Sequence, residues 1–564
     1  MALPRASRWR PREAPQCTFA ELYPRGTEGE PRLGEVAARL VGDLVEPVHD
    51  ALSALTIIAR PARVIDRVRE HLVAQATALV ARTLLQRLDD ARRAGALRGH
   101  SAEERFAAFV AESASSSGIA DIADDVPDMV AWVRLVVRTR RDAVLAMLHD
   151  TQSRWEAVTG AVAGARPEDR IEDIDLGTGD THGGGRSVAV LLLDSGRRVV
   201  AKPRDLWVEQ GFTRFASWLG ERVGIEVPEP TSYSTDLRGW VEHFDGRTPP
   251  AHGYPRVAGA LLAALYLLDA TDIHYENLLT DSRGLPVVVD AETLMTPRIE
   301  GLGFARSDGL LGVVATGMLS LRRERADDAN DEFDDRAFDP GALAYRPGDR
   351  SPFRGWKAVN VGRDDMRLEM ASIRVEHPGP APTAHPRTRA ERDELVGGFT
   401  DVVSWVLRHR ERTLRTIEES FERGSVRYVH RPTMLYHQVL RMATHPAFAG
   451  HEARRRVFGR LVVLDPPTPP RLVNAEMRQL AVGDMPSFRV SPRGTSVRDG
   501  HGADTGVRCR LSPLDHCLRA VSRLTDEDAE REAEAAHRAL DVWGSGESGK
   551  TGRTTTFAQE DGAL

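Results

Sequence analysis

The spacing of apolar residues divides the chain into helical parts and a strand-rich part. Apolar side chains recur at helical spacing in residues 64–91 and 129–148, with Arg and Asp on the other faces, so residues 1–165 are predicted to be mostly helical. Strand-like runs dominate residues 187–245, and helical spacing returns in residues 391–541. The pattern predicts an α+β chain whose strand-rich middle is flanked by large helical regions.

Residues 187–202 (SVAVLLLDSGRRVVAK) read as a β-hairpin with Lys202 at the end of its second strand. Lysine is rare here, because the 76 basic residues include only Lys202, Lys357 and Lys550. Lys is a compact point charge and Arg a wide planar fork, so the two are not interchangeable against phosphates. A lysine kept on this strand favours a role in binding ATP phosphates. The alternative is a chance surface lysine.

Residues 270–294 concentrate polar side chains around one apolar helix and one apolar strand. The polar side chains are Asp272, His274, Asn277, Asp290 and Glu292. Kinase-like phosphotransferases place one carboxylate at the attacking hydroxyl, and hold Mg²⁺ with an amide and a second carboxylate. Asn277 and Asp290 are therefore predicted Mg²⁺ ligands. The alternative is a polar loop that caps a helix and leads into a hairpin.

A glycine-rich loop precedes the predicted hairpin. Residues 177–187 read GTGDTHGGGRS and contain Gly183, Gly184 and Gly185 in a row. Consecutive glycines let backbone N–H groups approach a phosphate closely, so these three are candidates for nucleotide binding. A flexible turn would also use glycine, but Asp180 and His182 add titratable groups that a linker does not need.

Together with residues 427–433 (RYVHRPT), these motifs resemble, in order and spacing, the dehydratase domain of class II lanthipeptide synthetases. Residues 313–319 and 476–488 agree with that resemblance, which covers roughly residues 165–540. It implies a lipid-kinase-like bilobal core that uses ATP and Mg²⁺ to phosphorylate Ser and Thr of a ribosomal precursor peptide. Elimination of the phosphate would then give dehydroalanine and dehydrobutyrine.

The resemblance also assigns roles by position. The phosphorylation residues would be Lys202, Asp272, His274, Asn277, Asp290 and Glu292. The elimination residues would be Asp180, His182, Arg427 and Thr433. Arg427 would bind the leaving phosphate in fork geometry and Thr433 would hydrogen-bond nearby; without the resemblance these two read as a surface charge and a helix cap. The implied organisation is a helical region (1–165), a kinase-like core (166–300), an activation-type loop with an insertion (301–395), a helical lobe carrying elimination residues (396–541) and a flexible tail (542–564).

Two other functions remain open, namely a small-molecule or lipid kinase that stops at the phosphate, and a non-catalytic module that binds a peptide. Full synthetases of the resembled class also carry a zinc-dependent cyclase. The cysteines here are Cys17, Cys509 and Cys517, without CxxC spacing, so no zinc is expected. We therefore expect a separate cyclase, a shortened synthetase, or a pathway that ends at dehydro residues.

Composition narrows the class of partner. The 564 residues carry a net charge of −7, which argues against nucleic acid as the partner. The basic N-terminus lacks a following apolar segment, and the longest apolar run (259–268) is too short to span a bilayer, so a cytoplasmic protein is expected.

Two further motifs are expected to have no ligand. Residues 544–551 (GSGESGKT) fit the Walker A pattern but follow a charged helical stretch instead of a buried strand. Residues 327–335 form an acidic run without the glycine or spacing of a calcium loop, and read as a solvated loop.

Overall fold

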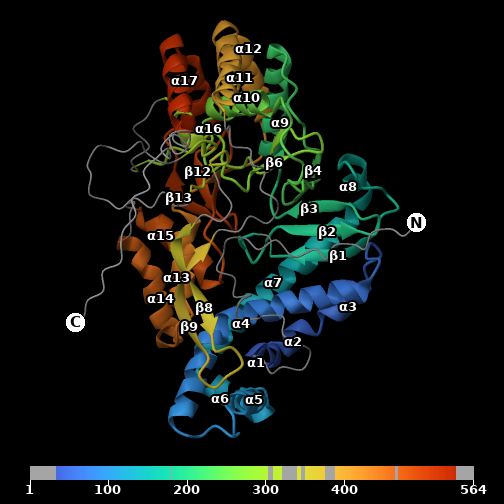
Figure 1. The fold of residues 1–564 in the computed structure, drawn as a ribbon, viewed down its shortest axis with the longest axis vertical. Coiled ribbons are helices and arrows are strands. Elements are labelled where there is room, and N and C mark those ends of the chain that lie inside the picture. Colours follow the sequence, from blue (N-terminus) through green and yellow to red (C-terminus); the bar gives the residue numbers. More distant parts are fainter. Residues whose placement is uncertain are drawn as a thin grey trace, which may run out of the picture.

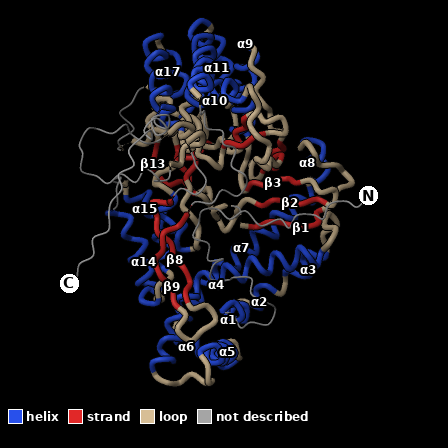
Figure 2. The backbone as a smooth tube through the Cα atoms, in the orientation of Figure 1, coloured by secondary structure: helices blue, strands red, loops and turns tan. Residues whose placement is uncertain are grey.

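The computed structural model describes residues 33–177, 179–300, 302, 309–320, 339–344, 350–374, 388–463 and 468–541. Most strands lie between an upper and a lower group of helices (Figures 1 and 2). The Walker-like motif, the acidic run and the predicted tail lie outside the described residues. Within the described part of the chain, no helix combines the length and the apolar character that crossing a membrane requires.

The N-terminal region is helical, as predicted. Its helices are α1 (Leu33–Leu40), α2 (Gly42–Val45), α3 (Val48–Ser53), α4 (Pro61–Arg93), α5 (Ala102–Ser113), α6 (Ser116–Asp125), α7 (Pro127–Ser153) and α8 (Trp155–Ala161). The long helices α4 and α7 pack together and contain the two stretches with helical periodicity. In α4, Val64, Val68 and Leu72 recur every four residues and are fully buried, so periodicity alone located this core.

A five-stranded sheet packs against these helices. Its strands are β1 (Ile171–Leu176), β2 (Ala189–Leu193), β3 (Arg198–Lys202), β4 (Ser232–Ser234) and β5 (Gly239–Glu242), in the order β1-β2-β3-β5-β4. The predicted hairpin is confirmed, because β2 and β3 pair antiparallel. Val199 and Ala201 belong to the core formed with α4 and α7. Side chains alternate along a strand, so Val200 and Lys202 lie on the opposite face.

Strands were predicted to dominate residues 187–245, but this range also contains a helix as long as its four strands together. Helix α9 (Trp207–Val223) follows β3 and leads to β4. Its Phe212, Phe215 and Leu219 follow helical spacing and are buried. The strand-like residues on both sides masked this periodicity.

Every residue of helix α10 (Tyr254–Leu267) except Arg256 is buried, and the helix leads into the polar loop of residues 270–277. It packs closely on α11 (Arg389–Arg408): a Cβ at Gly259 would lie 1.9 Å from the Leu395 carbonyl oxygen, so only glycine permits this approach. After the loop, β6 (Leu278–Thr280) and β7 (Pro286–Val288) form a hairpin that ends just before Asp290.

The C-terminal region contains a sheet that was not predicted. Strands β10 (Val426–Tyr428), β11 (Phe488–Val490), β12 (Ser496–Asp499) and β13 (Asp504–Arg508) form one antiparallel sheet in that order, although residues 396–541 were predicted to be helical. Strands of three to five residues are too short to reveal their period. Residues 301–395 likewise contain the hairpin β8 (Arg350–Val359) and β9 (Arg367–Arg374).

The remaining helices of this region do follow the predicted helical pattern. They are α12 (Arg410–Ser420), α13 (Thr433–Ala443), α14 (His451–Gly459), α15 (Pro470–Ala481), α16 (Pro513–Ser522) and α17 (Asp526–Asp541), with short 3₁₀ turns at Pro446–Phe448 and Arg460–Val463. Another 3₁₀ turn, Val314–Thr316, lies earlier in the chain. The described residues build two hydrophobic cores. The first core contains helices α9, α10, α11, α12, α16 and α17 together with the four-stranded sheet. The second core contains the N-terminal helices, the five-stranded sheet and helices α13, α14 and α15.

Candidate active site

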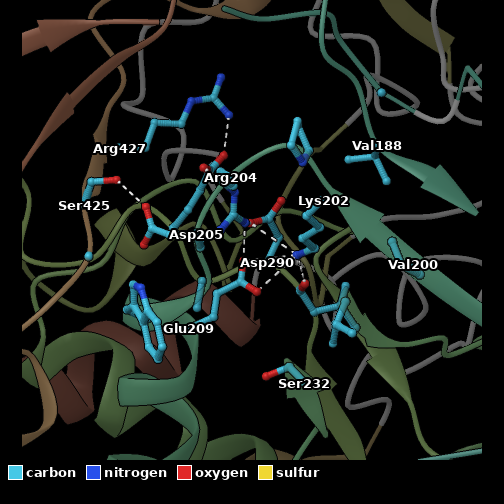
Figure 3. A pocket seen from close by; sticks show the side chains of 18 of the residues that line it. Val188, Val200, Lys202, Arg204, Asp205, Glu209, Ser232, Asp290, Ser425 and Arg427 are labelled. Atoms are coloured by element: carbon cyan, nitrogen blue, oxygen red, sulfur yellow. Dashed lines mark hydrogen bonds and ion pairs between the residues drawn. The ribbon is translucent and has the colours of Figure 1, made fainter. Parts of the chain in front are cut away.

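A cavity of about 1010 Å³ opens between the five-stranded sheet, the β6–β7 hairpin and the four-stranded sheet. Figure 3 shows side chains from these elements converging on it. The predicted residues that line it are Asp180, His182, Gly183, Lys202, His274, Asn277, Asp290, Glu292 and Arg427. Members of both groups that the resemblance assigned to different half-reactions therefore share one cavity, whereas Asp272 and Thr433 are not among its lining residues.

Lys202 reaches the cavity from the end of β3. Its ammonium is buried and donates to the Val289 carbonyl at 2.6 Å and to the Glu209 carboxylate at 3.1 Å. Glu209 lies in the first turn of α9, and Asp290 Oδ1 lies 3.8 Å from Lys202 Nζ (Figure 3). A buried lysine keeps its charge only when paired, and these carboxylates supply the pairing.

Arg204, two residues after Lys202, adds a second cation. Its guanidinium contacts Glu209, donates to Asp290 Oδ1 at 2.5 Å and lies 2.8 Å from Glu292 Oε2. Burial opposes ionisation of Asp290, but Lys202 and Arg204 outweigh burial and hold the pKa of Asp290 below its usual value. Asp290 is therefore an anion at neutral pH.

Glu292 is the carboxylate that joins the two groups of predicted residues. Besides Arg204, it accepts from Arg427 Nη1 at 2.8 Å and from Arg489 Nη2 at 2.6 Å. Burial alone would raise the pKa of Glu292, yet the three guanidinium groups hold it well below its usual range. Glu292 thus acts as a fixed counter-ion between β7 and the four-stranded sheet.

The loop after α10 carries Asp272, His274 and Asn277, of which His274 and Asn277 line the cavity. Asp272 has φ of 63°, a left-handed conformation that is uncommon outside glycine and is often kept at functional sites. Its carbonyl accepts from Asn277 Nδ2 at 2.9 Å, which leaves Asn277 Oδ1 available on the other side of the amide. Asp272 is exposed, yet desolvation by the protein packed around it raises its pKa, against the opposing effects of His274 and Arg427.

Asp180 and His182 reach the cavity from the glycine-rich loop. His182 Nδ1 lies 2.8 Å from the Met485 carbonyl oxygen, and because a carbonyl can only accept, Nδ1 carries the proton and Nε2 keeps its lone pair. Burial and the nearby Arg427 lower the pKa of His182, which favours this neutral form. Asp180 pairs with His437 Nε2 at 2.9 Å; burial opposes its ionisation, but His437, His182 and Arg427 together lower the pKa of Asp180.

The glycine loop is held from behind by Asp484. Its buried carboxylate accepts from the Gly184 amide at 2.6 Å and from the Gly185 amide at 3.0 Å. A Cβ at Gly185 would approach Arg140 of α7 to 3.0 Å, so this glycine allows close packing. Two of the three amides predicted to face a phosphate therefore donate to a carboxylate here, and Gly183 is the member that lines the cavity.

Arg427 and Thr433 follow one another around the end of β10. Arg427 lies in the middle of β10, and its backbone amide also donates to the Glu292 carbonyl at 2.7 Å. Thr433 is the first residue of α13, half-buried and one helical turn before His437. Thr433 therefore shares a helix face with the partner of Asp180, whereas Arg427 lines the cavity itself.

Comparison with known proteins identifies the family. The model of a family described as "Domain of unknown function (DUF4135)" matches residues 127–491, which is most of the chain. The chain belongs to this family. It is also 20% identical over 487 residues to the lacticin 481/lactococcin biosynthesis protein LcnDR2 of Lactococcus lactis subsp. lactis, covering 80% of this chain. The chain spans 50% of that relative's length. The resemblance to lanthipeptide synthetases seen in the motifs is confirmed.

In this DUF4135 chain, several cavity residues escaped the sequence analysis. They are Arg204, Glu209, Arg489 and Arg498 on the cavity wall, with His437 and Asp484 behind it. Glu209 and Arg204 could have been sought as partners of the rare lysine. The sequence also contains a pattern that could have indicated Arg489 and Arg498, because β10, β11 and β12 each place an apolar residue next to an arginine. Strands this short hide such alternation among the chain's many arginines.

Metal binding by protein side chains alone is not indicated. Among the described residues, no three His, Cys, Asp or Glu side chains are grouped as a metal site would need. Asn277 and Asp290 nevertheless fit the usual Mg²⁺ site, in which one or two protein oxygens act together with substrate phosphates. Cys509 and Cys517 are buried, and burial raises the pKa of Cys509 to about 12, which disfavours the thiolate that metals bind.

Proposed function

We propose that this chain is an ATP-dependent peptide dehydratase, which phosphorylates Ser and Thr side chains and then eliminates the phosphate. The observation that carries the proposal is that one cavity holds both Lys202 with Asp290 and Arg427 with His182. A kinase that stopped at the phosphate would need only the first pair. Glu292, which the resemblance places among the phosphorylation residues, connects the two walls through Arg204 and Arg427.

The first half-reaction rests on an arrangement that resembles protein kinases. In those enzymes a lysine on the third strand pairs with a helix glutamate, and a carboxylate after a later hairpin binds the metal that bridges the phosphates. Here Lys202 ends β3, pairs with Glu209 of α9, and lies near Asp290 after β7. The end of β5 and the loop after it, with Glu242, His243 and Phe244 on the cavity wall, match the position of the kinase hinge and would receive the adenine.

Asp272 would orient the attacking Ser or Thr hydroxyl and take up its proton. Its raised pKa makes the carboxylate a better proton acceptor than an exposed aspartate. His274, which opposes this rise in pKa, lies two residues further along the loop and lines the cavity. Transfer forms the bond from the hydroxyl oxygen to the γ-phosphorus of ATP, and breaks the bond between that phosphorus and the bridging oxygen, leaving ADP.

Asn277 and Asp290 would hold Mg²⁺. When bound, Mg²⁺ neutralises charge on the ATP phosphates and fixes their orientation. Asp290 offers a carboxylate kept ionised by Lys202 and Arg204, and Asn277 offers an amide oxygen. Both are the hard oxygen donors that Mg²⁺ prefers.

The second half-reaction would use His182 and Arg427. The free Nε2 lone pair of neutral His182 would accept the α-proton of the phosphorylated residue. The electron pair left by the C–H bond forms the Cα–Cβ double bond, and the Cβ–O bond breaks so that phosphate leaves with its electrons. Arg427, permanently charged, would stabilise the negative charge that grows on the leaving phosphate.

The substrate would be a ribosomal precursor peptide. The printed name of the relative LcnDR2 links it to biosynthesis of lacticin 481 and lactococcin. A cavity of about 1010 Å³ accommodates a nucleotide and a peptide side chain together. Formation of rings from the dehydro residues would require a cyclase activity, which we do not assign to the described residues.

Intact-mass measurement of a co-expressed precursor peptide tests the proposal. Each dehydration removes one water, whereas each stalled phosphorylation adds one phosphate group. Loss of water is the expected result. A stable phosphopeptide from the wild-type protein would leave a simple kinase, and an unchanged peptide that still binds would leave a non-catalytic module.

A further inference from the structure

Three arginines occupy one cross-strand row of the four-stranded sheet. Arg427 of β10 lies opposite Arg489 of β11, and Arg489 lies opposite Arg498 of β12. Residues directly opposite one another project from the same face of a sheet, with Cβ atoms about 5 Å apart. We call Arg427, Arg489 and Arg498 the arginine row. All three line the cavity.

The alternation of the strands places the row on the cavity face. Val426, Val490 and Val497, which neighbour the arginines along their strands, are buried in the hydrophobic core on the other side. Like charges directly opposite each other destabilise a sheet, so a row of three needs compensation. Glu292 compensates part of it by pairing with Arg427 and Arg489.

The compensation is incomplete among the described residues. Glu292 engages Nη1 of Arg427 and Nη2 of Arg489, and it is shared with Arg204. Arg489 Nη1 is buried without a hydrogen-bond partner, which is costly unless a ligand supplies an acceptor. Arg498 donates to the Gly502 carbonyl, which is uncharged. The row thus has donors and positive charge for an additional dianion.

We propose that the arginine row binds the phosphate monoester of the phosphorylated peptide side chain. Arg427 and Arg489 would hold the phosphate oxygens in two forks, with Glu292 fixing both guanidinium groups, and the exposed Arg498 would draw the phosphate toward the cavity mouth. This inference rests on the proposed function and adds Arg489 and Arg498 to it. The glycine-loop amides of Gly184 and Gly185, already bound to Asp484, are not needed for this phosphate.

A binding measurement tests the row without turnover. Calorimetry would compare a phosphoserine peptide with its serine counterpart, using the purified full chain without nucleotide. Wild-type protein should bind the phosphopeptide more tightly, and Arg489→Gln should lose about 10- to 100-fold of that preference, as for removal of charge-assisted hydrogen bonds. Arg489→Lys, which keeps the charge but not the fork, should lose less. Arg423→Gln is the matched control, because Arg423 lines the cavity outside the row.

The affinity for ATP shows whether the arginine row binds the phosphate of the phosphopeptide or the phosphates of ATP. Arg489→Gln should leave the Kd for ATP within about twofold, since ATP phosphates are expected at Lys202. The inference would be overturned if the wild-type protein bound both peptides with equal affinity. It would also be overturned if Arg489→Gln lost affinity for ATP while its phosphopeptide binding stayed unchanged. If Arg489→Gln does not fold, Arg498→Gln, an exposed site, should show a smaller loss of about two- to fivefold.

The proposed function is tested separately. Lys202→Ala should bind the phosphopeptide like the wild type, although it should form phosphopeptide far more slowly. If the wild-type protein never modifies the peptide but prefers the phosphoserine peptide, the dehydratase proposal is contradicted and phosphate binding by the arginine row is supported. If the wild-type protein dehydrates the peptide and Arg489→Gln is equally active, phosphate binding by the arginine row is contradicted and the dehydratase proposal is supported.

Discussion

The two walls of the cavity handle charge differently. On one wall the cations Lys202 and Arg204 pair with the carboxylates of Glu209 and Asp290. On the other wall, the ion pairs that the described residues make with the arginine row all go to Glu292, which is already shared with Arg204, while Asp272 and Asp290 act on Arg427 from further away. A balanced wall suits a nucleotide that arrives with its own Mg²⁺, because most of its charge is neutralised. A wall with excess positive charge suits a bare phosphate dianion.

The walls also differ in how visible they are in the sequence. Lys202 stands out because lysine is nearly absent from the chain, and Asp290 because it ends an apolar strand. Arg489 and Arg498 are two arginines among many, and only strand pairing shows that they lie opposite Arg427. A residue type that is rare in a chain signals a site, whereas a common type becomes informative only in three dimensions.

The largest effect is expected from a substitution in the wall where Lys202 and Arg204 pair with carboxylates. Lys202→Ala should lower peptide phosphorylation by about 100- to 1000-fold, the range for loss of one electrostatic stabiliser. The measurement is phosphopeptide plus dehydrated peptide by mass spectrometry over time. Lys550→Ala, in the Walker-like motif, is the control and should behave like wild type. An essential Lys550 with a dispensable Lys202 would contradict the assignment.

A second variant breaks the other wall. Arg427→Ala should slow elimination by about 100-fold while ATP is still consumed, so phosphopeptide accumulates. The physical reason is that elimination needs charge stabilised on the leaving phosphate, which transfer from ATP does not require of Arg427. If Arg427→Ala instead abolished phosphorylation, the two walls would not serve separate half-reactions.

The pH dependence of elimination sharpens the same distinction. Neutral His182 is the proposed base, and its pKa lies below the ordinary value of about 6.5, because burial and Arg427 disfavour the cation. Elimination from a synthetic phosphopeptide, with ADP and Mg²⁺ present, should therefore be constant from about pH 6.5 to 8 and fall about tenfold per unit only at lower pH. His182→Gln should remove this acid limb along with most activity. If the elimination rate already began to fall with decreasing pH above pH 7, His182 would be excluded as the base.

The smallest expected effect concerns the support behind the loop. Asp484→Ala removes a buried carboxylate from two backbone amides and should cost about 2–3 kcal/mol of stability. Thermal unfolding measures this as a lower Tm. Glu418→Ala, which removes a half-exposed partner of Arg493, should cost less than about 1 kcal/mol. Equal shifts would show that Asp484 does not hold the loop.

Much of the fold followed from periodicity. The long amphipathic stretches of α4 and α7 were located correctly, as was the β2–β3 hairpin that ends at Lys202. Helix α9 and the four-stranded sheet were not predicted. Long elements repeat their pattern several times, but a strand of three residues shows less than two periods, and its partners can lie more than 60 residues away, as for β10 and β11.

The sequence by itself determined which residue types are available for chemistry: one strand lysine, a block of acidic and amide groups after a buried helix, and a glycine loop with an aspartate and a histidine. Only the tertiary structure decided their partners. Glu209 meets Lys202, Asp484 occupies the glycine amides, and Glu292 joins Arg204 to Arg427 and Arg489. The physical reason is that the energy of a charge depends on its neighbours and its burial, and both are set by packing between segments far apart in the chain.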